Sequence, residues 1–303
     1  RAALPEGSLL ISNEPMRTRA QILAENMQKF GHEDVIVTNN YPRDFGKSRL
    51  MFDVILTDVP CSGEGMFRKD DTAISELSVQ NVEKCWRLQR EIVSDVWQCL
   101  KPGGLLIYST CTFNTKEDEE NIRYITEELG AELLPVDIDD SWKITGSLLS
   151  GFDKPVYRFL PGLTRGEGIF MAVMRKNGER DANDTPRKDK KAKKDKQRNS
   201  KKETASCNRD WIKDPDRFDI VTSDNITAAI PKAWRDVYDA AAKSLKILSA
   251  GITIGESKGK DIIPAQALAL SRALNKDTFA QAELNYAQAM SFLRKEAVTL
   301  PAD

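Results

Sequence analysis

Two cysteines follow neighbouring strands of a predicted parallel sheet. Cys61 lies in the loop DVPCSGEGMF (58–67), after the apolar run MFDVILTD, and Pro60 fixes the backbone of this loop. Cys111 lies in YSTCTFN (108–114), after the apolar run LLIYST. In open parallel sheets the ligand crevice lies at the carboxyl ends of the strands. A lone cysteine is more often a small buried apolar residue than a nucleophile, but two cysteines in equivalent loops indicate a shared chemical task.

This pair of thiols suits covalent catalysis on a pyrimidine base. Carbon 5 of cytosine is a weak nucleophile towards a sulfonium methyl donor, whereas a thiolate that adds to carbon 6 turns the ring into an electron-rich enamine. Such catalysis divides one difficult step into easier ones and requires a cysteine of lowered pKa. Asp58 is placed to share a proton with ring nitrogen 3, and the base must leave any stack to enter the pocket. The residues alone do not rank Cys61 and Cys111.

Glu14 is a further candidate, because it ends the first predicted strand. An acid in this place commonly holds the ribose hydroxyls of a nucleoside cofactor. The other interpretation is a carboxylate that merely stabilises the amino-terminal end of the following helix through the helix dipole. The residue alone leaves both interpretations open.

The first part of the chain, to about residue 176, alternates strand and helix signals, a pattern typical of a parallel α/β sheet. The predicted strands are LLISNE (9–14), DVIVT (34–38), MFDVILTD (51–58), LLIYST (105–110), VYRFLP (156–161) and IFMAVMR (169–175), the last two as an antiparallel pair. The predicted helices are residues 15–30, ended by Gly31; residues 78–100, capped by Ser78 and ended by KPGG (101–104); and a helix to Leu129 that begins with a Thr115–Asp118 capping box.

The rest of the chain is predicted to be a linker followed by a second, smaller domain. Residues 177–208 are rich in Lys, Arg, Asp, Asn and Ser, and such a segment cannot bury enough apolar surface to fold alone. Its stretch 187–202 has ten basic and two acidic residues. Either this stretch grips RNA phosphates and makes binding salt-dependent, or it is a solvated tether. Residues 209–303 contain short strands and two predicted helices, about 264–274 and 280–297, which indicate a small α+β domain.

Composition excludes several classes of protein. The length of 303 residues suggests about two domains, and 40% hydrophobic with 30% charged residues is ordinary for a globular protein. No apolar run approaches the roughly 18 residues that span a bilayer, so a cytoplasmic protein without membrane contact is expected. Five cysteines and one histidine suit neither a disulfide framework nor a zinc site. Cys85, Cys99 and Cys207 are interpreted as small apolar or incidental residues. The net charge of −1 leaves nucleic-acid contact to local patches.

Several motifs together resemble the RNA cytosine-5 methyltransferases of the Nop2/Sun type. They are DVPCSGEGMF, the KPGG turn before YSTCTFN, and the acidic stretch KEDEEN (116–121). RFLPGLTRGEGIF (158–170) and SAGITIGESKGKDIIPAQALAL (249–270) are similar to the branch that contains bacterial small-subunit rRNA methyltransferases. The resemblance covers most of the chain outside the linker. It implies a Rossmann-like class I methyltransferase sheet in residues 1–176 and an RNA-binding accessory α+β domain in residues 209–303.

The resemblance also implies roles. Cys111 matches the nucleophile that attacks carbon 6, and Cys61 matches the second cysteine, which assists product release. Asp58 matches an acid that contacts cofactor and base, and Glu14 and Pro60 are the further expected cofactor contacts. The cofactor implied is S-adenosyl-L-methionine, the partner is RNA, with 16S rRNA as the expected substrate, and no metal is implied.

Two features depart from the family pattern. The glycine-rich cofactor loop should lie about 20 residues before Glu14, so the resemblance implies that this loop and the first strand are missing and that the chain is a fragment cut at both ends. Tyr41 stands where many relatives have an acid that contacts the cofactor adenosine, and Asp44 is the neighbouring acid that would have to replace it.

Three readings of function therefore stand side by side. The first is an S-adenosylmethionine-dependent RNA cytosine-5 methyltransferase. The second is an RNA-binding remnant that is inactive because the cofactor loop is absent, and cofactor binding separates it from the first. The third is a methyltransferase for a protein or small molecule, which the paired cysteine loops disfavour because methylation of nitrogen or oxygen needs no thiol adduct.

Overall fold

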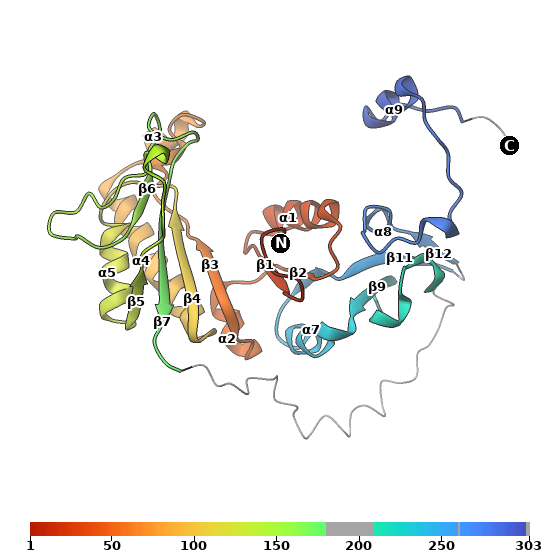
Figure 1. Ribbon diagram of the computed structural model, residues 1–303, viewed down its shortest axis with the longest axis horizontal. Helices are drawn as coiled ribbons and strands as arrows, with labels where there is room; N and C mark the ends of the chain where they lie inside the picture. Colours follow the sequence, from red (N-terminus) through yellow and green to blue (C-terminus); the bar gives the residue numbers. More distant parts are fainter. Residues whose placement is uncertain (180–208, 260, 301–303) are drawn as a thin grey trace.

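The computed structural model describes residues 1–179, 209–259 and 261–300 (Figure 1). The strands of the first part are β1 (Leu10–Asn13), β2 (Val35–Thr38), β3 (Phe52–Asp58), β4 (Leu100–Thr110), β5 (Ala131–Leu134), β6 (Tyr157–Phe159) and β7 (Ile169–Lys176). Its α-helices are α1 (Arg17–Phe30), α2 (Pro42–Ser48), α3 (Asp71–Glu76), α4 (Val79–Trp97) and α5 (Glu119–Glu127). Each of the six predicted strands is present, and β5 was not predicted.

A five-stranded sheet carries the core of the first part. Its order is β3–β4–β7–β5, with β6 also paired to β7. β3 and β4 are parallel, whereas β7 is antiparallel to all of its neighbours. Every second residue of β7 is buried, namely Phe170, Ala172 and Met174, as the period of two in a strand requires. The apolar faces of α4 and α5 complete this core through Val93, Ile122 and Ile125.

A second, three-stranded sheet has the order β1–β2–β10. β1 and β2 are parallel, whereas β10 (Ile247–Ala250) comes from the second part of the chain and is antiparallel to β2. The side chain of Asn40 extends this pairing, because its Oδ1 accepts from the backbone N of Lys246 at 3.0 Å and its Nδ2 donates to the carbonyl of Lys246 at 3.2 Å. The second part of the chain is therefore attached directly to the first.

The second part is built on an antiparallel sheet of order β12–β11–β9–β8. Its elements are β8 (Phe218–Ser223), β9 (Ile226–Pro231), α7 (Arg235–Ala242), β10, β11 (Ile252–Lys258), β12 (Asp261–Pro264), α8 (Gln266–Ala269) and α9 (Tyr286–Leu293). Phe218, Ala229, Ile254 and Leu268 form its buried core. The basic stretch 187–202 lies outside the described residues, and the division of the chain at residues 176 and 208 stays a prediction.

The predicted fold class, a Rossmann-like α/β sheet followed by a small α+β part, is confirmed. The strands of the first part, however, are divided between two sheets. Among the described residues, β1 pairs only with β2, and β3 pairs only with β4, so each has one open edge. Val54 and Leu56 of β3 are 46% and 62% exposed in consequence. The expectation of a further strand and a glycine-rich loop before Arg1 stays a prediction.

Of the three predicted helix ends considered next, two are wrong and one is confirmed. The Thr115–Asp118 capping box is wrong, because the Asp118 carboxylate accepts instead from Thr110 Oγ1 at 2.8 Å and from Arg158. The KPGG residues do not follow the helix as a free turn but lie inside β4, at an irregularity in its pairing with β3. The cap of α4 is confirmed, because Ser78 Oγ accepts from the backbone N of Asn81 at 3.1 Å.

The two helices predicted near the end of the chain are shorter than expected. α8 stops at Ala269 because the next residues turn to pack on the end of α1, where the backbone N of Arg272 donates to the Gly31 carbonyl at 3.0 Å. α9 starts late because Asn285 and Gln288 form the capping box there, each side chain accepting from the backbone N–H of the other. Local caps and tertiary contacts overrode the helical pattern.

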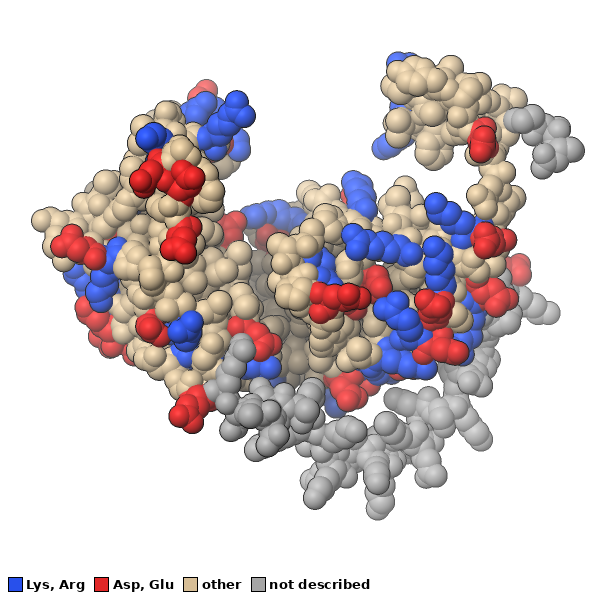
Figure 2. All heavy atoms as spheres, in the orientation of Figure 1, with Lys and Arg blue, Asp and Glu red and all other residues tan. Residues whose placement is uncertain are grey.

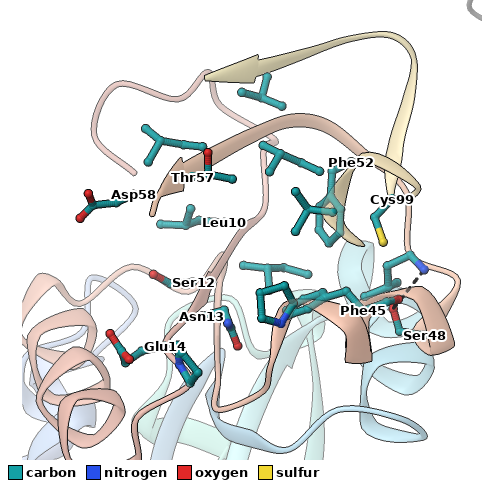
Figure 3. Close-up of a pocket in the computed structure, with 18 of the residues that line it drawn as sticks. Leu10, Ser12, Asn13, Glu14, Phe45, Ser48, Phe52, Thr57, Asp58 and Cys99 are labelled. Carbon is teal, nitrogen blue, oxygen red and sulfur yellow. Dashed lines mark hydrogen bonds between the residues drawn. The ribbon is translucent and has the colours of Figure 1, made fainter. Parts of the chain in front are cut away.

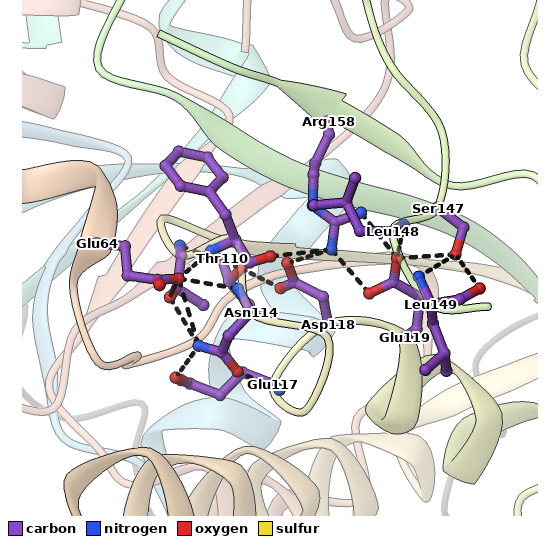
Figure 4. Close-up of polar contacts among 12 residues, drawn as sticks. Glu64, Thr110, Asn114, Glu117, Asp118, Glu119, Ser147, Leu148, Leu149 and Arg158 are labelled. Atoms are coloured by element: carbon purple, nitrogen blue, oxygen red, sulfur yellow. Dashed lines mark hydrogen bonds and ion pairs between the residues drawn. The ribbon is translucent and has the colours of Figure 1, made fainter. Parts of the chain in front are cut away.

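Arg158 in β6 is the largest fully buried side chain among the described residues (Figure 4). Its Nη1 and Nη2 each donate to one carboxylate oxygen of Glu119 at 2.7 Å, and Nη2 also donates to Asp118 Oδ2 at 3.0 Å and to the Phe113 carbonyl at 3.3 Å. Burial raises the pKa of Asp118 well above its usual range. Burial also acts to raise the pKa of Glu119, but the hydrogen bonds from Arg158 and from backbone N–H groups, together with the charge of Arg158, lower it overall. This ion pair anchors the chain just after Cys111.

We expect Arg158→Leu to lower the free energy of unfolding by about 3–5 kcal/mol, because it leaves two buried carboxylates without their cation. Urea unfolding followed by circular dichroism measures this. Arg175→Leu is the matched control, because Arg175 is an exposed partner of Glu132 at 3.5 Å and such pairs contribute roughly 0–1 kcal/mol. Equal losses for the two variants would contradict the structural role given to Arg158.

Candidate active site

The loops that carry Cys61 and Cys111 meet at one end of the five-stranded sheet. β3 and β4 run parallel with Asp58 opposite Ser109, so both loops leave the sheet on the same side. The two Sγ atoms are 2.9 Å apart, and both cysteines are partly exposed. The structure therefore brings together the two thiols that were singled out from sequence, and Asp58 ends the strand beside them.

The hydrogen bond between the two thiols shifts their pKa values in opposite directions. A hydrogen bond from the Cys61 thiol lowers the pKa of Cys111 to about 7, although burial and the negative charge of Asp58 oppose this. The same hydrogen bond, together with burial, raises the pKa of Cys61 far above the ordinary thiol range. As the pH rises through about 7, Cys111 therefore becomes the thiolate, which is the nucleophilic form of cysteine, while Cys61 keeps its proton.

The loops touch so closely that only glycine fits at one position. The backbone N of Gly65 donates to the Cys111 carbonyl at 2.7 Å. A Cβ added to Gly65 would lie 2.6 Å from that carbonyl oxygen and 3.2 Å from the carbonyl oxygen of Glu167. The hydroxyls of Ser62 and Thr112 are 3.1 Å apart in the same contact. Gly65 thus allows the backbone of one cysteine loop to lie directly on the other.

Glu14 and Asp58 line one large groove, together with Pro60, Cys61 and Cys111. The groove has a volume of about 4650 Å³ and lies between the open edges of β1 and β3. Figure 3 shows the two carboxylates at the same end of this groove, Glu14 directly after β1 and Asp58 as the last residue of β3. Both are at the carboxyl ends of their strands, where ligands of such sheets bind.

Glu14 also contacts the start of α1, so its structural interpretation stays open. Its Oε1 accepts from the backbone N of Met16 at 2.8 Å, and its Oε2 lies 3.2 Å from Arg19. Tyr41 lines the groove, whereas Asp44 caps α2 by accepting from the backbone N of Tyr41 at 3.1 Å. A hydrogen bond from Lys47 lowers the pKa of Asp44. These contacts do not support the suggestion that Asp44 replaces the acid that contacts the cofactor adenosine in many relatives.

Sequence reasoning missed the carboxylates that join the two loops, Glu64 and Glu117. Each accepts hydrogen bonds from the other cysteine loop, as Figure 4 shows in part. For Glu64, the only signal in the local sequence was its position between two glycines in the loop of Cys61. Cys85 and Cys99 are buried as expected, with pKa values raised by burial. Cys207 lies outside the described residues.

In the part of the chain that the structure describes, no helix is long and apolar enough to cross a membrane. The same residues contain no cluster of three or more His, Cys, Asp or Glu side chains that would suit a metal ion.

The sequence model of the family described as 16S rRNA methyltransferase RsmB/F matches residues 2–175. The chain therefore belongs to this family of methyltransferases. Among curated relatives, the ribosomal RNA small subunit methyltransferase F of Shewanella amazonensis is 33% identical over 176 residues, which cover 58% of this chain and 37% of that protein. The protein of the same name from Aliivibrio fischeri is 34% identical over 182 residues, with the same two coverages. The chain thus spans less than half the length of these relatives.

The solved structure of NSun6 from Pyrococcus horikoshii with SFG is also similar to this chain. It is 26% identical, with a TM-score of 0.49, and the match covers 57% of this chain and 42% of that one.

Alkylation by iodoacetamide, read at each cysteine by mass spectrometry from pH 5 to 9, measures the thiolate fraction of Cys111. We expect half-maximal reactivity near pH 7. Cys61→Ala removes the hydrogen-bond donor, so the pKa of Cys111 should rise towards the ordinary value of about 8.5 and its reactivity at pH 6 should fall about tenfold or more. Cys61→Ser keeps a hydrogen-bond donor, so the reactivity of Cys111 at pH 6 should fall less in this variant. A midpoint that stays near pH 7 in Cys61→Ala would show that Cys61 does not stabilise the thiolate.

Proposed function

We propose that this protein is an S-adenosylmethionine-dependent RNA cytosine-5 methyltransferase that acts on 16S rRNA through a covalent cysteine adduct. The observation that carries the proposal is the Cys111 thiol, whose pKa is lowered to about 7 by the Cys61 thiol at 2.9 Å, in a groove that also contains Asp58. Membership of an rRNA methyltransferase family supports the substrate class. Simple methylation of nitrogen or oxygen would use no such thiol pair.

The residues of the groove fit a nucleoside cofactor. Glu14 follows β1 at the carboxyl end of a parallel pair, where an acid receives hydrogen bonds from ribose hydroxyls. Asp58 and Pro60 line the same groove. When bound, S-adenosylmethionine supplies the methyl group as an electrophilic sulfonium. The roles of Glu14, Asp58 and Pro60 in holding it are part of the proposal.

The proposed reaction begins when Cys111 Sγ bonds to carbon 6 of a cytosine that has left its stack. The electron pair of the 5,6 double bond moves to carbon 5, while Asp58 shares a proton with ring nitrogen 3. The methyl group passes to carbon 5 as its bond to the sulfonium sulfur breaks, and carbon 5 still carries its original proton. A base removes this proton, the electron pair of the carbon–hydrogen bond re-forms the double bond, and the bond between Sγ and carbon 6 breaks with its pair returning to Sγ. Cys61 acts in this last stage, because its thiol is the group that touches Cys111.

A covalent trap tests the chemistry. RNA transcripts of 16S rRNA containing 5-fluorocytosine are incubated with the protein and S-adenosylmethionine, and adducts are read on a denaturing gel. Fluorine on carbon 5 cannot be removed as a proton is, so the adduct should persist. Cys111→Ala should abolish the adduct, whereas Cys61→Ala should retain it.

The other outcomes are equally informative. An adduct lost only in Cys61→Ala would reverse the roles of the two thiols. Cofactor binding without any adduct on these RNAs would contradict the proposed cytosine chemistry but not the fold.

Cofactor affinity, measured by isothermal titration calorimetry, separates this function from that of an RNA-binding protein without methyl transfer. We expect S-adenosylmethionine to bind and Glu14→Gln to weaken binding about tenfold, because hydrogen bonds to a charged acceptor are worth roughly 1.5–3 kcal/mol. Glu25→Gln, an exposed change on α1, is the matched control and should bind as the parent does. A protein that binds RNA but not S-adenosylmethionine would favour the alternative.

A further inference from the structure

Two carboxylates join the cysteine loops in opposite directions, and Figure 4 draws part of this arrangement. Glu64 belongs to the loop of Cys61, yet its hydrogen bonds come from the loop of Cys111. Its Oε2 accepts from the backbone N of Phe113 at 2.6 Å, from the backbone N of Asn114 at 2.8 Å and from Thr112 Oγ1 at 2.6 Å. These three donors are the residues that directly follow Cys111.

Glu117 makes the reciprocal contact. It follows the loop of Cys111 and is fully buried, and its Oε2 accepts from the backbone N of Ser62, the residue after Cys61, at 3.0 Å. Gln89 of α4 donates both to Glu117 Oε2 at 2.7 Å and to the Pro60 carbonyl at 2.9 Å. The backbone is thus held on both sides of Cys61.

Asn114 links the two carboxylates to each other. Its Nδ2 donates to Glu117 Oε1 at 2.8 Å, and its Oδ1 accepts from the backbone N of Glu117 at 3.0 Å, while its own backbone N donates to Glu64. The result is a closed network in which neither loop can shift without breaking several charge-assisted hydrogen bonds.

The charges of these residues do not favour the thiolate. A carboxylate near a thiol raises the thiol pKa, and the charge of Glu117 acts in this direction on Cys111. Stabilisation of the Cys111 thiolate therefore does not explain why two carboxylates are found here. What the two carboxylates supply is geometry, because they hold the loops at the separation at which the thiols are 2.9 Å apart.

We propose that Glu64 and Glu117 are positioning residues for the thiol pair, and that together they hold the Cys61 S–H against Cys111 Sγ. This deepens the proposed function and rests on it for its catalytic meaning. The thiol contact itself requires no RNA and no cofactor, so its dependence on the two carboxylates can be measured separately.

The test is the pH profile of Cys111 alkylation in Glu64→Gln, with no RNA or cofactor present. The groups that face Cys111 are Cys61, Asp58 and Glu117, and all remain in this variant. A positioning role predicts that the thiols separate and that the Cys111 midpoint rises by about one pH unit, with about tenfold slower alkylation at pH 6. A purely electrostatic role predicts the opposite sign, because removing a negative charge lowers a thiol pKa.

Glu76→Gln is the matched control, since Glu76 is an exposed carboxylate on α3, and its profile should coincide with that of the parent. If Glu64→Gln does not fold, as judged by its thermal unfolding, Thr112→Val replaces it, because this change removes one donor to Glu64 and keeps the shape. A midpoint that is unchanged or lowered in the folded variant overturns the proposal.

The covalent trap distinguishes failure of this inference from failure of the proposed function. An upward shift of the Cys111 midpoint in Glu64→Gln, combined with no adduct in the parent protein, supports the positioning role and sinks the cytosine chemistry. A full adduct in the parent with an unshifted midpoint in Glu64→Gln supports the cytosine chemistry and contradicts the positioning role.

Discussion

The hydrogen bond between the thiols of Cys61 and Cys111 is the interaction that the rest of the site serves. At 2.9 Å it determines which sulfur carries the proton, and it lowers the pKa of Cys111 against both burial and the charge of Asp58. A contact between two partly exposed side chains in loops is easily lost, since loops tolerate motion. It persists here because β3 and β4 are parallel neighbours and because each loop is fixed to the other.

The polar groups that fix these loops are buried at a cost that the structure offsets by pairing nearly all of them. Arg158 neutralises Glu119 and reaches Asp118 and the Phe113 carbonyl, so the chain after Cys111 is anchored to β6. Burying such charges rarely adds net stability over a well-packed apolar core. The network instead fixes a single conformation of the loops, because a satisfied polar network has one geometry whereas apolar contacts tolerate several.

Much of the fold was predictable because its signals are local. The apolar runs of β3 and β4 and the cap at Ser78 lie within a few residues of the elements that they define, and the rule for parallel sheets then predicted that Cys61 and Cys111 would meet. Glu64 and Glu117 were not predictable, because a carboxylate in a loop usually faces solvent. Their partners lie about 50 residues away in sequence and become neighbours only after β3 and β4 pair. The same applies to β10, which joins β2 from the far end of the chain.

The shared proton also explains why two thiols serve the proposed reaction better than one. The pKa of Cys61 is raised chiefly by its hydrogen bond to Cys111. Once Cys111 Sγ is bonded to carbon 6 it carries no negative charge, so the main cause of that raised pKa disappears. In the proposed reaction Cys61 then loses its proton to solvent more readily, and its thiolate takes the carbon-5 proton. In the proposed reaction, the same contact favours a thiolate on Cys111 before the adduct forms and a more acidic Cys61 afterwards.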